Sequence, residues 1–202
     1  MKKCYLLMLI LSFCISTFAQ AQSIHVNAGW NLLSLPVIPT DSLKNSIFPA
    51  AASSAFIYRD SYQIKDTLQN GPGFWLKFDS AETVNITGNT IYDDTIEVHT
   101  GWNIIGSISM PVPVDSIKSD PPDLIISNYF NYIGGTYQST DTLQSGFGTW
   151  VKTKQNGSII LSSDTIPASG VPCPGMPTVE YDGKTYHTVQ IGYQCWLKEN
   201  LD

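Results

Sequence analysis

An internal repeat limits the architectures open to this chain more than any other feature. The motif GWN occurs at 29–31 and again at 101–103. A second motif, which begins DTLQ, continues through glycines and ends with a tryptophan and a lysine two residues apart, occurs at 66–77 and at 141–152. Two motifs that recur in the same order predict a tandem duplication.

A third matched feature fixes the extent of the repeats. Asp41 and Asp115 each precede a serine, and each lies between the two motifs of its own copy. The sequence therefore predicts one repeat over 22–97 and a second over 98–163. Each repeat is too short to bury a large core alone, so we expect the two to pack together as one unit.

Short apolar segments separated by turn residues predict an all-β fold. Gly29 interrupts an alternating segment and predicts a bulge or turn inside a strand. Gly134 and Gly135 suit a two-residue hairpin turn, which needs positive φ. Asp41 and Ser42 predict an N-cap for one short helical turn over 43–48, with a counterpart in the second repeat. The expected fold is two tandem β-rich repeats, as a sandwich or small barrel, with one short helical turn each.

The N-terminus predicts export. A basic start at residues 2–3 precedes an apolar run over 5–18, and small residues follow at Ala19 and Ala21. This pattern is typical of a secretory signal peptide, expected over 1–21 with cleavage near one of the two alanines. The apolar run is too short for a transmembrane helix. We therefore expect a secreted or outer-cell-surface protein whose mature chain does not insert into a membrane.

The charge of the mature chain disfavours polyanionic partners of two kinds. Removal of Lys2 and Lys3 reduces the 11 basic side chains to nine, against 17 acidic ones, which gives a net charge near −8. A nucleic-acid-binding protein needs a basic face to neutralise phosphates, and anionic lipid makes the same demand. The sequence predicts neither partner.

The cysteines favour one disulfide. Cys4 and Cys14 lie in the expected signal peptide, and Phe13 occupies a position where a lipid-anchoring motif needs a small residue. The mature chain keeps only Cys173 and Cys195. In an exported chain this pair predicts a disulfide, with free thiols or an intermolecular link as alternatives.

The C-terminal part differs in character from the repeats. Four prolines lie within 164–177, which predicts a stiff linker. Beyond it, Asp182 and Gly183 predict the turn of a β-hairpin over 179–186. The segment 178–202 is therefore expected to form a separate C-terminal hairpin module.

Two resemblances add to this interpretation. The repeats, with GWNLLSLP and GFWLK, resemble repeats of secreted and surface proteins of Bacteroidetes-type bacteria. The tail, with DGKTY, TVQIG, QCWL and ENL, resembles the opening of the Fibrobacter succinogenes major paralogous domain, with Leu197 in place of that family's methionine. The resemblance implies a surface or secreted protein without catalysis. Because that domain continues well beyond this length, 178–202 is expected to be its truncated start.

The four tryptophans of the repeats allow two interpretations. Trp30, Trp75, Trp102 and Trp150 occupy matched positions in the two copies. An exposed set would form a platform for sugar rings, whereas a buried set would fill the core. Recurrence in step with the turns favours the core, and the sequence predicts Trp30 and Trp102 to be mostly buried.

Three tyrosines are candidates for ligand contact. Tyr129, Tyr132 and Tyr137 lie on or beside the expected hairpin of the second repeat. They motivate the alternative function, a carbohydrate-binding module with exposed aromatic residues. The leading expectation is a non-catalytic interaction or spacer module, and the expected partners are a polysaccharide or other surface proteins.

Short Asp-Ser and Asp-Thr sequences followed by an aliphatic residue or alanine recur along the chain. They suit turns and caps, because such side chains bond nearby backbone amides. They also resemble the O-glycosylation motif of exported Bacteroidetes proteins. The candidate acceptors are Ser42, Thr67, Ser80, Thr95, Ser116, Thr142 and Thr165.

No pattern in the sequence predicts an enzyme. No nucleophile motif, phosphate loop or dinucleotide fingerprint occurs. Loop carboxylates could contribute to a calcium site, but they lack the spacing of a calcium loop. We expect neither a cofactor nor a resident metal. The carboxylates and histidines weighed for these roles are Asp93, Asp94, Glu97, Asp120, Asp123, His25, His99 and His187.

Overall fold

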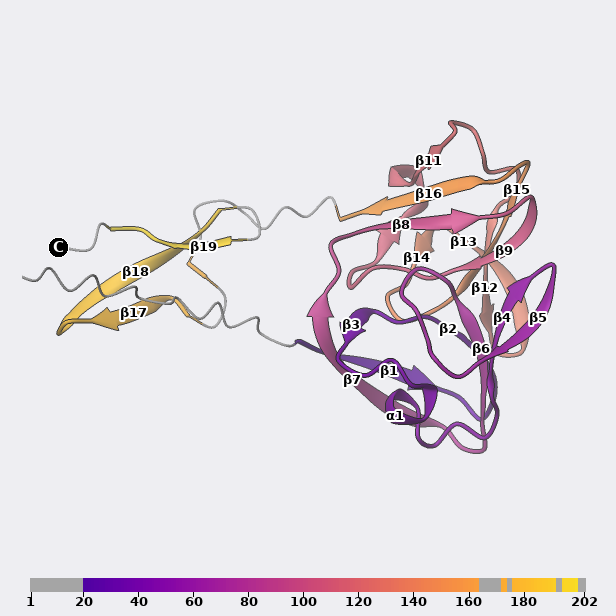
Figure 1. Cartoon of the computed structure of the whole chain (residues 1–202), viewed down its shortest axis with the longest axis horizontal. Coiled ribbons are helices and arrows are strands. Elements are labelled where there is room, and N and C mark those ends of the chain that lie inside the picture. The colour runs from indigo at the N-terminus through magenta and orange to yellow at the C-terminus, as the bar shows by residue number, and fades with distance from the viewer. Residues whose placement is uncertain (1–19, 164–171, 174–175, 192–193, 200–202) are drawn as a thin grey trace, which may run out of the picture.

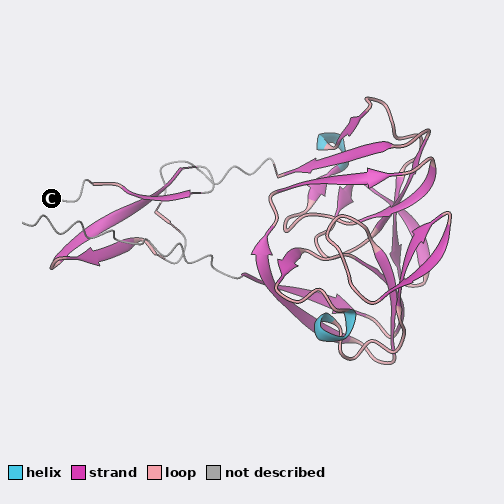
Figure 2. Ribbon diagram, viewed as in Figure 1, coloured by secondary structure: helices cyan, strands magenta, loops and turns pink. Residues whose placement is uncertain are grey.

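The computed structural model describes residues 20–163, 172–173, 176–191 and 194–199. Its fold is all-β, as the sequence predicts (Figure 2). Most of the expected signal peptide and most of the proline-rich linker lie outside these residues. Among the residues described, no helix has the length and apolarity to cross a bilayer.

The first repeat forms two antiparallel sheets (Figure 1). Its strands are β1 Gln20–Val26, β2 Gly29–Leu33, β3 Val37–Pro39, β4 Ala55–Arg59, β5 Ser61–Lys65, β6 Phe74–Phe78 and β7 Glu82–Thr90. A three-stranded sheet has the order β1-β7-β3, and a four-stranded sheet has the order β2-β6-β4-β5.

The second repeat reproduces this plan. Its strands are β8 Asp93–Val98, β9 Gly101–Ile105, β10 Val112–Pro113, β11 Lys118–Asp120, β12 Tyr129–Ile133, β13 Thr136–Thr140, β14 Thr142–Leu143, β15 Thr149–Thr153 and β16 Gly157–Ser162. The four-stranded sheet β9-β15-β12-β13 matches its counterpart strand for strand, and β8 and β16 match β1 and β7. The third strand of the three-stranded sheet differs, because β11 comes from a later segment of its repeat than β3 does. The second repeat also has an added two-stranded sheet of β10 and β14. β8 crosses the expected boundary between residues 97 and 98 and pairs with β16.

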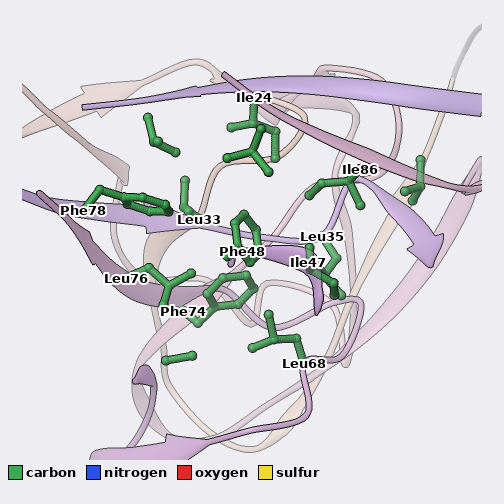
Figure 3. Close-up of a cluster of buried hydrophobic side chains, with 14 residues drawn as sticks. Ile24, Leu33, Leu35, Ile47, Phe48, Leu68, Phe74, Leu76, Phe78 and Ile86 are labelled. Carbon is green, nitrogen blue, oxygen red and sulfur yellow. The ribbon is translucent and has the colours of Figure 1, made fainter. Parts of the chain in front are cut away.

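Each repeat has its own apolar core between its two sheets. Figure 3 shows the first core, in which Phe48 lies at the centre. The Phe48 ring centre is 5.8 Å from that of Phe74 and 6.4 Å from that of Phe78. Burial of each such side chain stabilises the fold by about 1.5–3 kcal/mol. The second core is built from the second repeat together with Ile91, which precedes β8.

The helical turns agree with the prediction in number but not in capping. α1 Lys44–Ile47 lies within the predicted 43–48, and a 3₁₀ turn, η1 Val114–Ser116, occurs in the second repeat. The N-cap residue of α1 is Leu43, so the prediction of an Asp41 or Ser42 cap was wrong. Asp41 instead accepts the Leu43 N–H at 2.9 Å. The Ser46 side chain, followed by this bond from Leu43, lowers the Asp41 pKa.

The GWN motif is a turn between two sheets. β1 and β2 belong to different sheets, and Gly29 adopts φ +94° where the chain changes from one to the other. Asn31 holds this turn, because its side chain accepts the Asn27 N–H at 2.9 Å and donates to the Asn27 carbonyl at 2.8 Å. Of the two alternatives for Gly29, the turn is confirmed.

The second copy of the motif has the same bonds. Gly101 adopts φ +98°. The Asn103 side chain accepts the His99 N–H at 2.9 Å and donates to the His99 carbonyl at 2.7 Å. Both asparagines are 7 % exposed. The asparagine therefore recurs because it satisfies backbone groups that the turn leaves unpaired.

The two repeats hydrogen-bond to each other in a reciprocal way. The Gly148 N–H donates to the Leu32 carbonyl and the Gly73 N–H donates to the Ile104 carbonyl, each at 3.0 Å. In the first repeat β6 pairs with β2, and β2 also pairs with the segment that enters β15. In the second repeat β15 pairs with β9, and β9 also pairs with the segment that enters β6. This closed circuit joins the repeats around an approximate twofold axis.

Two glycines allow the repeats to approach this closely. A Cβ atom on Gly73 would lie 2.4 Å from Ile104 Cγ2 and 3.1 Å from the Cα of Gly148. A Cβ atom on Gly148 would lie 2.9 Å from Leu32 Cγ. Any side chain at Gly73 would push its segment away from β9, and any side chain at Gly148 would push its segment away from β2.

The C-terminal part is a three-stranded sheet in which the predicted hairpin is confirmed. Its strands are β17 Thr178–Tyr181, β18 Lys184–Ile191 and β19 Gln194–Leu197. Asp182 and Gly183 both have positive φ in the turn between β17 and β18. A disulfide joins Cys173 to Cys195, with their Cα atoms 5.8 Å apart, so the predicted pairing is present.

We expect Asn31→Ala or Asn103→Ala to lower the free energy of unfolding by about 1–3 kcal/mol, because each leaves buried backbone groups unpaired. Urea denaturation followed by tryptophan fluorescence measures this loss. The control is Asn45→Ala, at an exposed position. An equal loss of unfolding free energy in the control would contradict the role of the two asparagines in holding the turns.

We expect Gly73→Ala to lower the free energy of unfolding by about 1–3 kcal/mol, because the added methyl group overpacks the contact between the repeats. Thermal unfolding by circular dichroism measures the change. Gly135→Ala is the comparison, because its added Cβ meets no atom within 4 Å and tests only the positive φ of 84°. A fully stable Gly73→Ala variant would be inconsistent with the close approach.

Candidate functional site

The strand pleat places tryptophan and lysine together on the outer face of each four-stranded sheet. In β6, Phe74, Leu76 and Phe78 point into the core. Successive side chains of a strand alternate between faces, so Trp75 and Lys77 point outward. β15 repeats this arrangement with Trp150 and Lys152.

Strand register brings further aromatic rings to the same face. Phe56 lies opposite Trp75, and Tyr58 lies opposite Tyr62. Trp30 lies opposite Lys77. We call the resulting set, with its counterparts in the second repeat, the twin aromatic surface: Trp30, Phe56, Tyr58, Tyr62, Trp75, Trp102, Phe130, Tyr132, Tyr137 and Trp150.

Distances inside the two halves of this surface agree closely. The Trp30 and Phe56 ring centres are 5.8 Å apart, and those of Trp102 and Phe130 are 6.0 Å apart. Tyr58–Tyr62 and Tyr132–Tyr137 are both 5.3 Å. Nearly all pairs meet edge to face, which is the favoured arrangement for aromatic rings.

Each repeat also covers the tryptophan of the other. Tyr58 lies 4.9 Å from Trp150, and Tyr132 lies 4.7 Å from Trp75, between ring centres. Leu32 and Ile104 are buried with these two tryptophans. The surface is therefore continuous across the two repeats.

Exposure divides the four repeat tryptophans into two pairs. Trp75 and Trp150 are 7 % and 9 % exposed, whereas Trp30 and Trp102 are 45 % and 40 % exposed. The prediction that Trp30 and Trp102 are mostly buried was wrong. Both stand on the outer face at the start of a strand, where ring edges of the same repeat contact them and the other sheet does not cover them.

A shallow groove crosses this surface. It has a volume of about 380 Å³ and is lined by Tyr58, Trp102, Phe130, Tyr137 and Trp150. The lining comes from both repeats, and its exposed surface is almost entirely apolar. Such a groove takes a ligand with an apolar face.

The floor of the surface contains unused hydrogen-bond donors. The indole nitrogens of Trp75 and Trp150 are buried and have no hydrogen-bond partner. Burial, followed by the neighbouring Tyr62, raises the pKa of Tyr137. The Trp150 indole partly offsets this rise from nearby, although it does not reach hydrogen-bonding geometry with the Tyr137 hydroxyl.

The tyrosines singled out from the sequence separate into two groups. Tyr132 and Tyr137 belong to the twin aromatic surface. Tyr129 does not, because it occupies the inward face of β12, is 7 % exposed and packs in the second core. Burial raises the pKa of Tyr129 to about 12.

Sequence reasoning missed several members of the surface. Phe56, Tyr58 and Tyr62 were not singled out, and neither was Phe130. The sequence could have indicated them, because each has an aromatic counterpart in the other repeat. Phe56 also lies two residues from Tyr58 within one strand and therefore on the same face. Phe130 and Tyr132 have the same spacing in their strand.

The candidate O-glycosylation acceptors that the structure describes are all at least partly accessible. Thr67, Ser80 and Thr95 are exposed, and Ser42, Ser116 and Thr142 are half-buried. Thr165 lies outside the described residues. The Ser116 hydroxyl donates to the Pro113 carbonyl at 2.8 Å, which suits the turn interpretation at that position. Glycosylation stays a prediction.

Two of the carboxylates weighed for calcium make other contacts. Asp93 accepts the Ser162 hydroxyl at 2.6 Å, and Glu97 accepts the Ser158 hydroxyl at 2.8 Å, both between β8 and β16. Burial raises the pKa of Asp94. Within the described part of the chain, no three His, Cys, Asp or Glu side chains gather where they could hold a metal ion.

Comparison with protein-family models, curated proteins and solved structures found no match to the chain. The resemblances of the repeats and of the tail therefore stay predictions, and the functional argument rests on the twin aromatic surface.

Proposed function

We propose that this protein is a secreted or cell-surface, non-catalytic interaction module that binds carbohydrate on its twin aromatic surface. The observation that supports this proposal is the exposure of Trp30 and Trp102 at matched places on a surface built from both repeats. Buried rings would have favoured a purely structural role. The exposed pair favours the carbohydrate alternative over a spacer.

The chemistry of a sugar ring suits this surface. The C–H groups of a pyranose form an apolar face, whereas its hydroxyls lie around the edge. Stacking on an indole removes apolar area from water and leaves the hydroxyls free to hydrogen-bond. Large exposed aromatic patches are uncommon on soluble proteins and mark interaction sites.

The other pair of tryptophans has a structural part in the same proposal. Trp75 and Trp150 are buried under the tyrosines of the opposite repeat. They fix the positions of the exposed rings around them. Binding and folding are thereby divided between the two tryptophans of each repeat.

Other features support an extracellular setting. The disulfide between Cys173 and Cys195 fits an oxidising compartment. The net charge near −8 of the mature chain opposes binding to nucleic acid and to anionic membranes.

The proposal predicts that Trp30→Ala combined with Trp102→Ala weakens polysaccharide binding at least about tenfold, because stacking on each ring contributes roughly 1 kcal/mol or more. Retention on immobilised neutral and acidic polysaccharides, followed by titration calorimetry on the retained one, measures this loss. Circular dichroism checks that the variant is folded.

The control is Ile38→Ala, which removes an exposed apolar side chain from the three-stranded sheet of the first repeat. Wild-type protein that binds no polysaccharide of the panel would overturn the carbohydrate proposal. Equal binding by wild type and the double tryptophan variant would show that the ligand does not bind at Trp30 and Trp102.

A further inference from the structure

We propose that the twin aromatic surface selects acidic carbohydrate, with the carboxylate of a uronic acid bound by Lys77 and Lys152 beside the exposed tryptophans. This inference rests on the proposed function, because it names the class of sugar that the same surface takes.

Register places one lysine beside each exposed indole. Lys77 lies directly opposite Trp30, and Lys152 lies directly opposite Trp102. Directly opposed residues point to the same face, with their Cβ atoms about 4.5–5.5 Å apart. The Lys152 ammonium lies 5.9 Å from the centre of the Trp102 ring. A sugar that stacks on this indole therefore meets the ammonium group, which lies over the same ring.

The lysine is the one charged side chain at the outward positions of each four-stranded sheet. In the first repeat these positions are Trp30, Leu32, Phe56, Tyr58, Tyr62, Ile64, Trp75 and Lys77. The second repeat has the same pattern, with Ser139 in place of Ile64. Among the described residues neither lysine has an ion-pair partner within 4.0 Å.

Local charge decides the sign of the ligand here. The chain as a whole is acidic, but charges farther than about 8 Å are largely screened at physiological ionic strength. No outward position of these strands carries a carboxylate, so Lys77 and Lys152 are the charged groups that these positions present to a bound sugar. Both copies place a cation at this one position of an otherwise apolar face, which gives charge complementarity to an anionic ring.

The groove gives a stacked ring an apolar wall. Its lining includes Tyr58 of the first repeat together with Trp102 and Phe130 of the second. A uronate ring offers a C–H face for Trp102 and a carboxylate for Lys152.

A methyl ester separates charge from ring stacking. Oligogalacturonate and oligomannuronate are the acidic probes, and their fully methyl-esterified forms keep the ring but lose the charge. We expect wild-type protein to bind at least one acid form about two- to thirtyfold more tightly than its ester, the range for two exposed charge pairs. Titration calorimetry at 50 mM and 200 mM NaCl measures both affinities, and the preference should shrink at the higher salt.

Lys77→Gln combined with Lys152→Gln should abolish this preference while keeping ester binding. Lys118→Gln combined with Lys198→Gln changes the net charge equally at exposed positions outside the surface and should keep the preference.

The outcomes separate the two proposals. Equal affinity for acid and ester, or a preference that survives the double lysine variant, overturns the acidic selectivity and leaves carbohydrate binding intact. Failure to bind any polysaccharide overturns both. Loss of acid and ester binding together in the Trp30→Ala, Trp102→Ala variant, with loss of preference alone in the lysine variant, supports both.

Discussion

Segments 71–73 and 146–148 each form backbone hydrogen bonds with a strand of the other repeat, and these bonds join the two repeats. Gly73 and Gly148 let the backbones approach, and the pairing closes into a circuit. A sheet of four strands that ended at β2 would expose an unpaired edge, which invites association with other chains. The duplication removes that edge, because each repeat caps the other.

The same closure creates the surface that carries the proposed function. Trp75 and Trp150 are covered by tyrosines that come from opposite repeats. Neither repeat alone would bury its tryptophan or complete the groove, since Tyr58 belongs to one repeat and the other four lining residues belong to its twin. The proposed binding on this face therefore depends on both repeats.

Patterns with local causes were predictable. The alternation of apolar residues, the Asp182-Gly183 turn and the repeated glycines specify strands and turns through backbone preferences, and all of these appear in the structure. Exposure of Trp30 was not predictable in this way. Its burial depends on which sheet covers it, and that is set by contacts between residues far apart in the chain. Tyr129 was misplaced for a related reason, because the face that it shares follows from strand register.

The sequence by itself determined that the chain is all-β, with a duplicated body and a C-terminal hairpin, because period-two patterns, turn residues and recurring motifs are local signals. The tertiary structure alone decided how the two copies close on each other and which of the two tryptophans in each repeat meets solvent. Those outcomes depend on the docking of distant segments across an approximate twofold axis. The two tryptophans of one repeat can therefore be assigned to core or surface only once that docking is known.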